Sequence, residues 1–334
     1  MKKTLLFIAA AVAALVSCQN KQETVNENTV PEVKGVPMTL QASFSGATKT
    51  TFTPDGSGLK QTWDATESIS VVTLSNSGTS GKLVSVDTFT STGVAGRTDA
   101  TFSGTFTGGE TPAFVMAVYP ALEFDGVSSS YHTPAYNNGS NNLIWDAKIG
   151  SIFCNSDYHE LTQTADNNLD HFTNFCLMIG TVDIDDIKLG TLTTTLSNMM
   201  SVIKIVATFP DSFKGKQLTS LDISCYDSAD NTNDIFCSDS WEYLNIVDAQ
   251  LLSPGSASRN SNSIYGTFNV PDTGVATIYM PCNFGSSVDF TAGDYWNLTA
   301  TVNSVDLGPV KKTFTKDVSM TRGKMYTVNV TFTE

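Results

Sequence analysis

Apolar and polar residues alternate along most of the chain after residue 37. In the segment 325–332, "MYTVNVTF", the residues that share one face are Tyr326, Val328, Val330 and Phe332. Successive side chains of a strand point to opposite faces, so this two-residue period predicts strands with one buried and one solvated face. Further strands are predicted at 38–44, 68–74, 82–89, 100–107, 113–119, 200–209, 217–225, 262–269, 275–280, 297–303 and 311–318.

Turn-forming residues separate these short strands, and helical periodicity is scarce, with a helical turn or two permitted near 191–199. Many short strands joined by polar turns are typical of β-sandwiches, whose inner faces form the core. The pattern therefore predicts an all-β fold.

Two stretches of the chain are similar to each other. Residues 100–120 contain Gly104-Thr105-Phe106 and end near Tyr119, and residues 263–281 contain Gly266-Thr267-Phe268 and end near Tyr279. Two β-hairpins can share such a pattern by chance, but a repeat is also the signature of related domains. We expect an N-terminal β-sandwich domain at 38–194 and a C-terminal one at 195–334.

The first residues have the layout of an export signal. Lys2 and Lys3 precede a twelve-residue apolar run, Leu5 to Val16, which is shorter than the ~20 residues that span a bilayer. "LVSC" then resembles the lipoprotein signal, so residues 1–17 are interpreted as a lipoprotein signal peptide and Cys18 as the acylated (for example palmitoylated) first residue of the mature protein. Residues 18–37 are polar and read as a flexible tether.

The charge and the cysteine content argue against a nucleic-acid-binding protein and against a disulfide-rich scaffold. The chain has 19 basic and 33 acidic residues and a net charge of −14, which argues against nucleic acid as a partner. The five cysteines after Cys18 are widely spaced and odd in number, unlike a disulfide framework. A Cys225–Cys237 bridge is the one pairing left open.

No catalytic motif is present, and no cofactor or metal is expected. Cys154 and His159 could form a nucleophile pair, or bind zinc with His171, but their spacing is typical of neither site. The segment 227–234, "DSADNTND", is rich in oxygen ligands but lacks the spacing of a calcium loop, and a solvated loop is favoured. We therefore expect a protein that is not an enzyme.

Tryptophans provide one further candidate site. Trp63, Trp145, Trp241 and Trp296 could each stack on a sugar, but tryptophan is more often packed in a sandwich core, as we expect for Trp63. Trp145 lies in the loop-rich "YNNGSNNLIWD" and is the best candidate for a glycan contact.

An ordered set of motifs resembles the fimbrillin-like family of Bacteroidales, the subunits of lipoprotein-derived fimbriae. After the lipoprotein signal come "FSGATKTTF" (44–52), "WDATESISV" (63–71), "FSGTF…AFVMAVYP" (102–120), "LSNMMSVIKIVATF" (196–209) and "RGKMYTVNVTF" (322–332). The resemblance implies two tandem transthyretin-like β-sandwiches. It also implies a surface-exposed outer-membrane lipoprotein that is a shaft, anchor or tip subunit of a fimbrium and contributes to adhesion. Its partners would be other fimbrial subunits and a host or bacterial surface receptor or glycan.

In such fibres a trypsin-like protease removes the first strand, and a neighbour's strand fills the groove. Two segments have the alternation that such an exchange requires. The first is the strand that could be lost, with apolar residues Met38, Leu40, Ala42 and Phe44. The second is a possible donor strand, with Tyr326, Val328, Val330 and Phe332. Each segment also fits an ordinary strand of its own domain, and the second would then be the last strand of the C-terminal domain.

The cleavage site departs from the family pattern, because no arginine precedes residue 97. Lys34 and Lys49 are the basic candidates. Cleavage after Lys34 would leave the strand 38–44 attached, and cleavage after Lys49 would remove it. A glycan-binding lipoprotein that does not polymerise is the alternative function, and an anchored hydrolase has no positive feature in the sequence.

Overall fold

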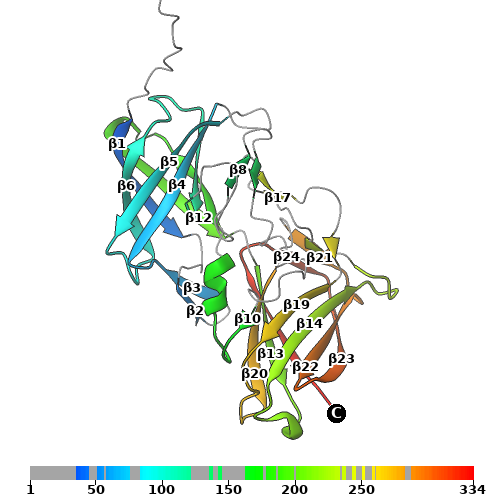
Figure 1. Ribbon diagram of the computed structural model, residues 1–334. Coiled ribbons are helices and arrows are strands. Elements are labelled where there is room, and N and C mark those ends of the chain that lie inside the picture. Colours follow the sequence, from blue (N-terminus) through cyan, green and yellow to red (C-terminus); the bar gives the residue numbers. More distant parts are fainter. Residues whose placement is uncertain are drawn as a thin grey trace, which may run out of the picture. The chain divides into compact units, whose positions relative to one another are not determined.

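The all-β expectation is confirmed by the computed structural model, in which the regular elements of the described residues are strands and three short 3-10 turns (Figure 1). The structure describes residues 35–44, 51–55, 58–75, 83–121, 135–137, 142–144, 162–175, 178–185, 187–198, 201–233, 235–237, 243–245, 250–252, 258–259, 261–282 and 287–334. Within these residues, no helix is long and apolar enough to cross a membrane.

Seven strands form a closed ring around the first hydrophobic core, in the order β1-β12-β11-β7-β4-β5-β6. Alternating residues of these strands are buried, as in β6, where Ala100, Phe102 and Phe106 point inward. The strands are β1 (Val36–Phe44), β4 (Thr66–Leu74), β5 (Leu83–Thr92), β6 (Asp99–Phe106), β7 (Phe114–Tyr119), β11 (Met178–Asp183) and β12 (Thr191–Asn198).

The ring closes between β5 and β6 over only two residue pairs, Phe89–Gly104 and Thr90–Ser103. Beyond this short ladder, the buried Asp87 joins the two sides, because its carboxylate accepts hydrogen bonds from the backbone N–H and the hydroxyl of Thr107 at 2.8 and 2.6 Å. The Asp87 side chain therefore extends the contact between β5 and β6 beyond the two backbone pairs.

Two larger sheets surround the second hydrophobic core. One has the order β10-β19-β14-β22-β23 and the other the order β20-β13-β25. Their strands are β10 (Thr162–Gln163), β13 (Ser201–Thr208), β14 (Leu218–Tyr226), β19 (Ser261–Gly266), β20 (Val275–Cys282), β22 (Tyr295–Val302), β23 (Val305–Thr313) and β25 (Met325–Thr331).

The remaining elements are short. Small sheets pair β2 (Thr51–Asp55) with β3 (Gly58–Thr62), β15 (Phe236–Cys237) with β18 (Ser258–Arg259), and β21 (Ser287–Phe290) with β24 (Val318–Thr321). A fourth joins β17 (Gln250–Leu252), β16 (Tyr243–Asn245), β9 (Asn142–Ile144) and β8 (Ala135–Asn137). The 3-10 turns are η1 (Asp170–Phe175), η2 (Ile187–Leu189) and η3 (Asp211–Phe213).

Residues 191–198 form the strand β12, and the helical turn permitted there is not formed. Leu192, Thr194 and Leu196 are buried while the residues between them face outward, so a strand uses the alternation fully. The boundary expected at 194/195 falls within β12, and the division into two domains stays a prediction.

Each of the two groups contains one strand whose neighbours are arranged in the same way. In the ring, β1 lies between β12, which is parallel to it, and β6, which is antiparallel. In the second group, β13 lies between the parallel β25 and the antiparallel β20. This pairing relates β6 to β20, whereas the sequence similarity aligned the strand before Pro120, β7, with β20.

Candidate functional site

The first strand of the ring is the centre of the candidate site. Residues Val36–Ser43 pair with β6, and residues Thr39–Phe44 pair with β12. Both edges of β1 are therefore hydrogen-bonded along most of its length. If β1 left the ring, it would expose two rows of unpaired backbone groups, one on each neighbouring strand.

The predicted inward face of β1 is the buried one. Leu40 is fully buried, Met38 and Ala42 are nearly so, and Phe44 is partly buried in the same core. The residues between them face outward, with Gln41 exposed. Residues 38–44 are thus an integral core strand of their own chain in this structure.

Trp63 forms the end of the pocket that holds β1. Its ring lies 4.2 Å from that of Phe44, 5.1 Å from Phe102 and 5.5 Å from Tyr119, measured between ring centroids. The Tyr119 hydroxyl donates to Glu67 at 2.9 Å, so Glu67, part of the Trp63 motif in the sequence, orients an aromatic wall of the pocket. As expected from the sequence, Trp63 is a core residue.

Gly104 permits the close approach of β5 to β6 beside this pocket. A Cβ atom at Gly104 would lie 2.7 Å from the Phe89 ring and 2.8 Å from the Thr88 carbonyl oxygen. Gly266 of the second Gly-Thr-Phe motif is equally confined, since its Cβ would lie 2.9 Å from the Leu218 carbonyl oxygen. In both motifs glycine lets two strands pack closely.

The second predicted segment, 325–332, is the last strand of the second core. Val330 and Phe332 are buried, and Tyr326 and Val328 are partly buried against the same core. Phe332 stacks on Phe209 at 5.2 Å between ring centroids. This placement agrees with an ordinary intrachain strand, and a donor role in another subunit stays a prediction.

Several predicted sites lie outside the described residues. They are the signal peptide, the lipidation site Cys18, the processing sites Lys34 and Lys49, the glycan candidate Trp145, and the residues Cys154, His159 and Trp241. Of the other tryptophans, Trp63 and Trp296 are buried in the two cores.

Cys225 is a free buried thiol, so the Cys225–Cys237 bridge is not formed. Cys282 is likewise free and buried in the same core. Burial raises the pKa of both thiols well above the ordinary value, which makes them poor nucleophiles.

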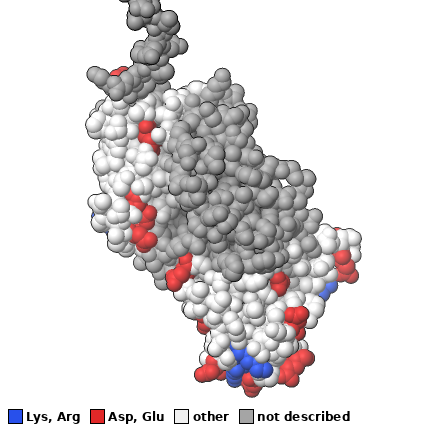
Figure 2. Space-filling model, viewed as in Figure 1, with Lys and Arg blue, Asp and Glu red and all other residues white. Residues whose placement is uncertain are grey.

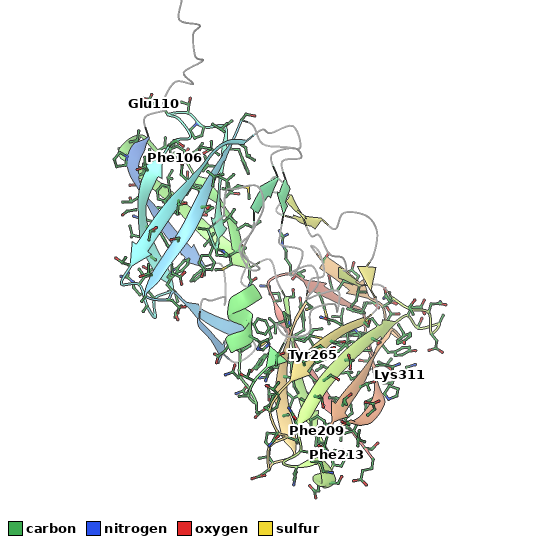
Figure 3. All side chains as sticks on the ribbon, viewed as in Figure 1. Phe106, Glu110, Phe209, Phe213, Tyr265 and Lys311 are labelled. Atoms are coloured by element: carbon green, nitrogen blue, oxygen red, sulfur yellow. The ribbon has the colours of Figure 1, made fainter. Side chains whose placement is uncertain are left out.

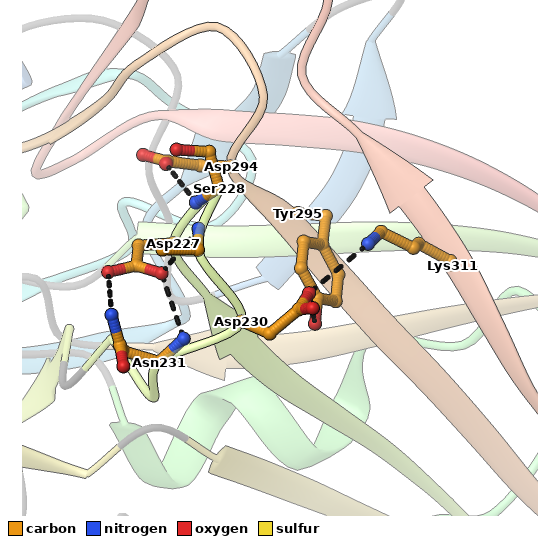
Figure 4. A network of polar contacts seen from close by, with 8 residues as sticks. Asp227, Ser228, Asp230, Asn231, Asp294, Tyr295 and Lys311 are labelled. Atoms are coloured by element: carbon orange, nitrogen blue, oxygen red, sulfur yellow. Dashed lines mark hydrogen bonds and ion pairs between the residues drawn. The ribbon is translucent and has the colours of Figure 1, made fainter.

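The acidic loop after β14 is an internally bonded turn (Figure 4). The Asp227 carboxylate accepts hydrogen bonds from the backbone N–H groups of Ala229 and Asn231 and from the Asn231 amide, each at 2.8–2.9 Å. Asp230 accepts from the Tyr295 hydroxyl at 2.8 Å. These carboxylates are occupied by donors, and no cluster of metal-ligating side chains occurs within the described residues.

Residues 162–171 cover the edge of β20, an arrangement that the sequence did not predict. The Gln163 side chain is fully buried, and its amide behaves as a peptide group: it accepts from the backbone N–H of Tyr279 at 2.9 Å and donates to the carbonyl of Thr277 at 2.9 Å. His171 Nε2 lies 2.8 Å from the Tyr279 carbonyl oxygen. We call residues 162–171 the strap.

No known family profile matches the chain, and a search of curated proteins finds no match either. Among solved structures, a candidate cell adhesion protein from Bacteroides uniformis is 13% identical, with a TM-score of 0.47 over 89% of this chain and 94% of its own. One from Bacteroides ovatus is 10% identical, with a TM-score of 0.49 over 90% and 95%. The fimbrial anchor protein from Porphyromonas gingivalis is 9% identical, with a TM-score of 0.34 over 84% and 83%. These structural neighbours are Bacteroidales fimbrial and cell adhesion proteins, the kind of protein that the sequence motifs resemble.

Proposed function

We propose that this chain is a structural subunit of cell-surface fimbriae that assembles by replacement of its first strand. Two things support this proposal: the ordered motifs of the sequence and one observation on the first strand. The strand β1 is the first described element of the chain, follows the predicted tether, and has both edges and its inner face engaged in a closed ring.

Loss of β1 would leave a slot that only another strand can fill. The slot would be bounded by the unpaired edges of β6 and β12, and its floor would be the apolar positions vacated by Met38, Leu40 and Ala42. Burial of one such large side chain contributes roughly 1.5–3 kcal/mol, and the unpaired backbone groups add a further penalty. A strand from a neighbouring subunit with the same two-residue period satisfies both requirements.

In this proposal the lipid on Cys18 brings the precursor to the outer membrane, and cleavage after Lys49 releases β1. Cleavage after Lys34 would leave β1 in place, which suits an anchor subunit. The assembled fibre then contributes to adhesion by binding other subunits or a surface receptor, and no catalytic step is involved.

The experiment is to purify the protein from the cell surface, to compare unboiled and boiled samples on a denaturing gel, and to determine the mature N-terminus by mass spectrometry. The proposal expects a ladder of high-mass species that collapses on boiling, with an N-terminus at residue 50. Lys49→Ala should abolish the ladder, and Lys34→Ala serves as the matched control. Monomer that begins at acylated Cys18 under all growth conditions would contradict polymerisation.

A further inference from the structure

The two outer edges of the three-stranded sheet β20-β13-β25 differ in how their backbone groups are satisfied. On β20, the groups of Thr277 and Tyr279 point away from β13 and bond to the strap. The next outward residue is Pro281, which has no N–H, and its carbonyl accepts from the Asn262 amide at 3.0 Å. The edge of β20 is therefore closed to another strand.

The edge of β23, the last strand of the facing sheet, is protected by composition. It carries Gly308 and Pro309, followed by two lysines, Lys311 and Lys312. Proline and lysine are residues that natural proteins use to prevent edge-to-edge pairing.

The edge of β25 has neither protection. The Lys324 carbonyl oxygen accepts a hydrogen bond from the N–H of Val202, and the N–H of Phe332 donates to the Thr208 carbonyl, so the even-numbered residues bond to β13. By alternation, the backbone groups of Thr327, Asn329 and Thr331 point outward, and their side chains are exposed. Among the described strands, β25 pairs only with β13.

We propose that the outer edge of β25 binds β25 of a second copy of this chain, antiparallel and centred on Asn329. This lateral contact goes beyond strand replacement at β1, because β25 stays in its own sheet. Two identical edges that pair across a twofold axis form a closed dimer and cannot propagate.

The residues of this edge complement themselves in that register. Thr327 of one copy lies opposite Thr331 of the other, and Asn329 lies opposite its own equivalent, so the outward backbone groups face each other as bonded pairs. Residues 325–333 carry no charge. The exposed charges at the two ends of this segment, Lys324 and Glu334, fall opposite one another, which joins a cation to an anion twice in the dimer.

A groove lies beside the end of β25. It has a volume of about 570 Å³ and lies between Thr333, the turn η3 and the strand β23. Val305, 47% exposed, is one of its apolar walls. Figure 3 labels two aromatic residues, Phe209 and Phe213, at this end of the second core.

The test uses the full chain carrying Cys18→Ser, so that acylation plays no part, and compares single cysteines under a mild oxidant. Directly opposed residues of a bonded antiparallel pair have Cα atoms about 5.5 Å apart, within disulfide reach. Asn329→Cys should therefore form a covalent dimer in most of the protein. Thr327→Cys, two positions away from the axis, should give no more dimer than the parent chain.

A second arm combines Thr327→Cys with Thr331→Cys, which should restore the cross-link. Equal cross-linking of both single variants, or none in Asn329→Cys, would overturn the proposal. The precursor in this test is not cleaved, so the cross-link reports on the edge of β25 independently of strand replacement. A cross-link here, together with no ladder in the cell-surface preparation described above, supports this contact and counts against strand replacement. A ladder in the cell-surface preparation without a cross-link in Asn329→Cys supports strand replacement and counts against the contact at β25.

Discussion

Gln163 and Tyr279 are 116 positions apart, yet the side-chain oxygen of Gln163 accepts the backbone N–H of Tyr279 at 2.9 Å. The same side chain is fully buried and also bonds to Thr277. A side chain here takes the place of a neighbouring strand, and it ties the strap to the edge of β20.

Gln163→Ala should lower the free energy of unfolding by about 1–3 kcal/mol, because it leaves buried backbone groups of β20 without partners. Chemical denaturation of the full chain measures the change. Gln217→Ala is the matched control, since its side chain is exposed, and should stay within about 0.5 kcal/mol of the parent. Equal effects of both substitutions would contradict a specific role for Gln163.

His171 should make stability depend on pH. Burial, opposed by the hydrogen bond to Tyr279 and by the charge of Asp170, lowers its pKa from 6.5 to about 4. Nδ1 is buried without a hydrogen-bond partner in the described structure. The unfolded chain therefore takes up a proton first, and stability that is complete above pH 6.5 is lost as the pH falls toward 4, by about 3 kcal/mol.

His171→Gln should remove this contribution while keeping a donor for the Tyr279 carbonyl. Urea unfolding of both proteins between pH 4 and 7.5 gives the comparison, in which the carboxylates common to both cancel. Parallel stability curves for the parent and the variant would show that His171 is not the group responsible.

Gly104→Ala should destabilise the ring by about 1–3 kcal/mol, because the new methyl group would overlap the Phe89 ring and the Thr88 carbonyl. Thermal unfolding of the full chain measures it. Ser103→Ala, an exposed neighbour on β6, is the control and should change little. An unchanged melting temperature for Gly104→Ala would mean that β5 and β6 can separate at no cost.

Leu40→Ala should cost about 2–5 kcal/mol, because Leu40 is fully buried at the centre of β1. Gln41→Ala, its exposed neighbour on the same strand, controls for changes in strand propensity. The denaturant midpoints of the two variants, compared with that of the parent chain, measure this loss of stability. If Leu40→Ala were as stable as Gln41→Ala, the pocket under β1 would contribute little to holding that strand.

Calcium should not affect stability. The carboxylates of Asp227, Asp230 and Asp294 accept hydrogen bonds from protein donors, and the pKa of Asp227 is lowered mainly by its hydrogen bonds with Asn231. The melting temperature should be the same in excess chelator and in millimolar calcium. A calcium-dependent rise that Asp227→Asn abolishes would show that the loop binds the ion. On the part of the face that Figure 2 colours, acidic side chains are more prominent than basic ones. A small rise in melting temperature that persists in Asp227→Asn would therefore reflect general screening of these charges.

The period-two pattern predicted the strands closely where one face is buried. Tyr326, Val328, Val330 and Phe332 pack toward the core as the alternation requires, and Leu40 does the same in β1. Glycine positions such as Gly104 were recognised as part of a motif, but their physical reason, the approach of Phe89, needed coordinates.

Pairing partners were beyond the sequence. The alignment of 100–120 with 263–281 matched residue types correctly, yet β1 and β13 are the strands that occupy equivalent places. Gln163 gave no signal, because a buried glutamine that caps a strand edge looks in sequence like any polar loop residue.

The sequence by itself determined the class of secondary structure and the buried face of the major strands, because alternation is a local property of the pleated backbone. Only the tertiary structure decided that β1 is held on both edges within a closed ring, that the strap covers β20 and that the edge of β25 is left open among the described strands. These outcomes depend on contacts between residues far apart in the sequence, such as Thr39 with Thr191 and Gln163 with Tyr279. The backbone groups that pair strands are nearly the same in every residue, so the sequence alone does not show which strands will pair.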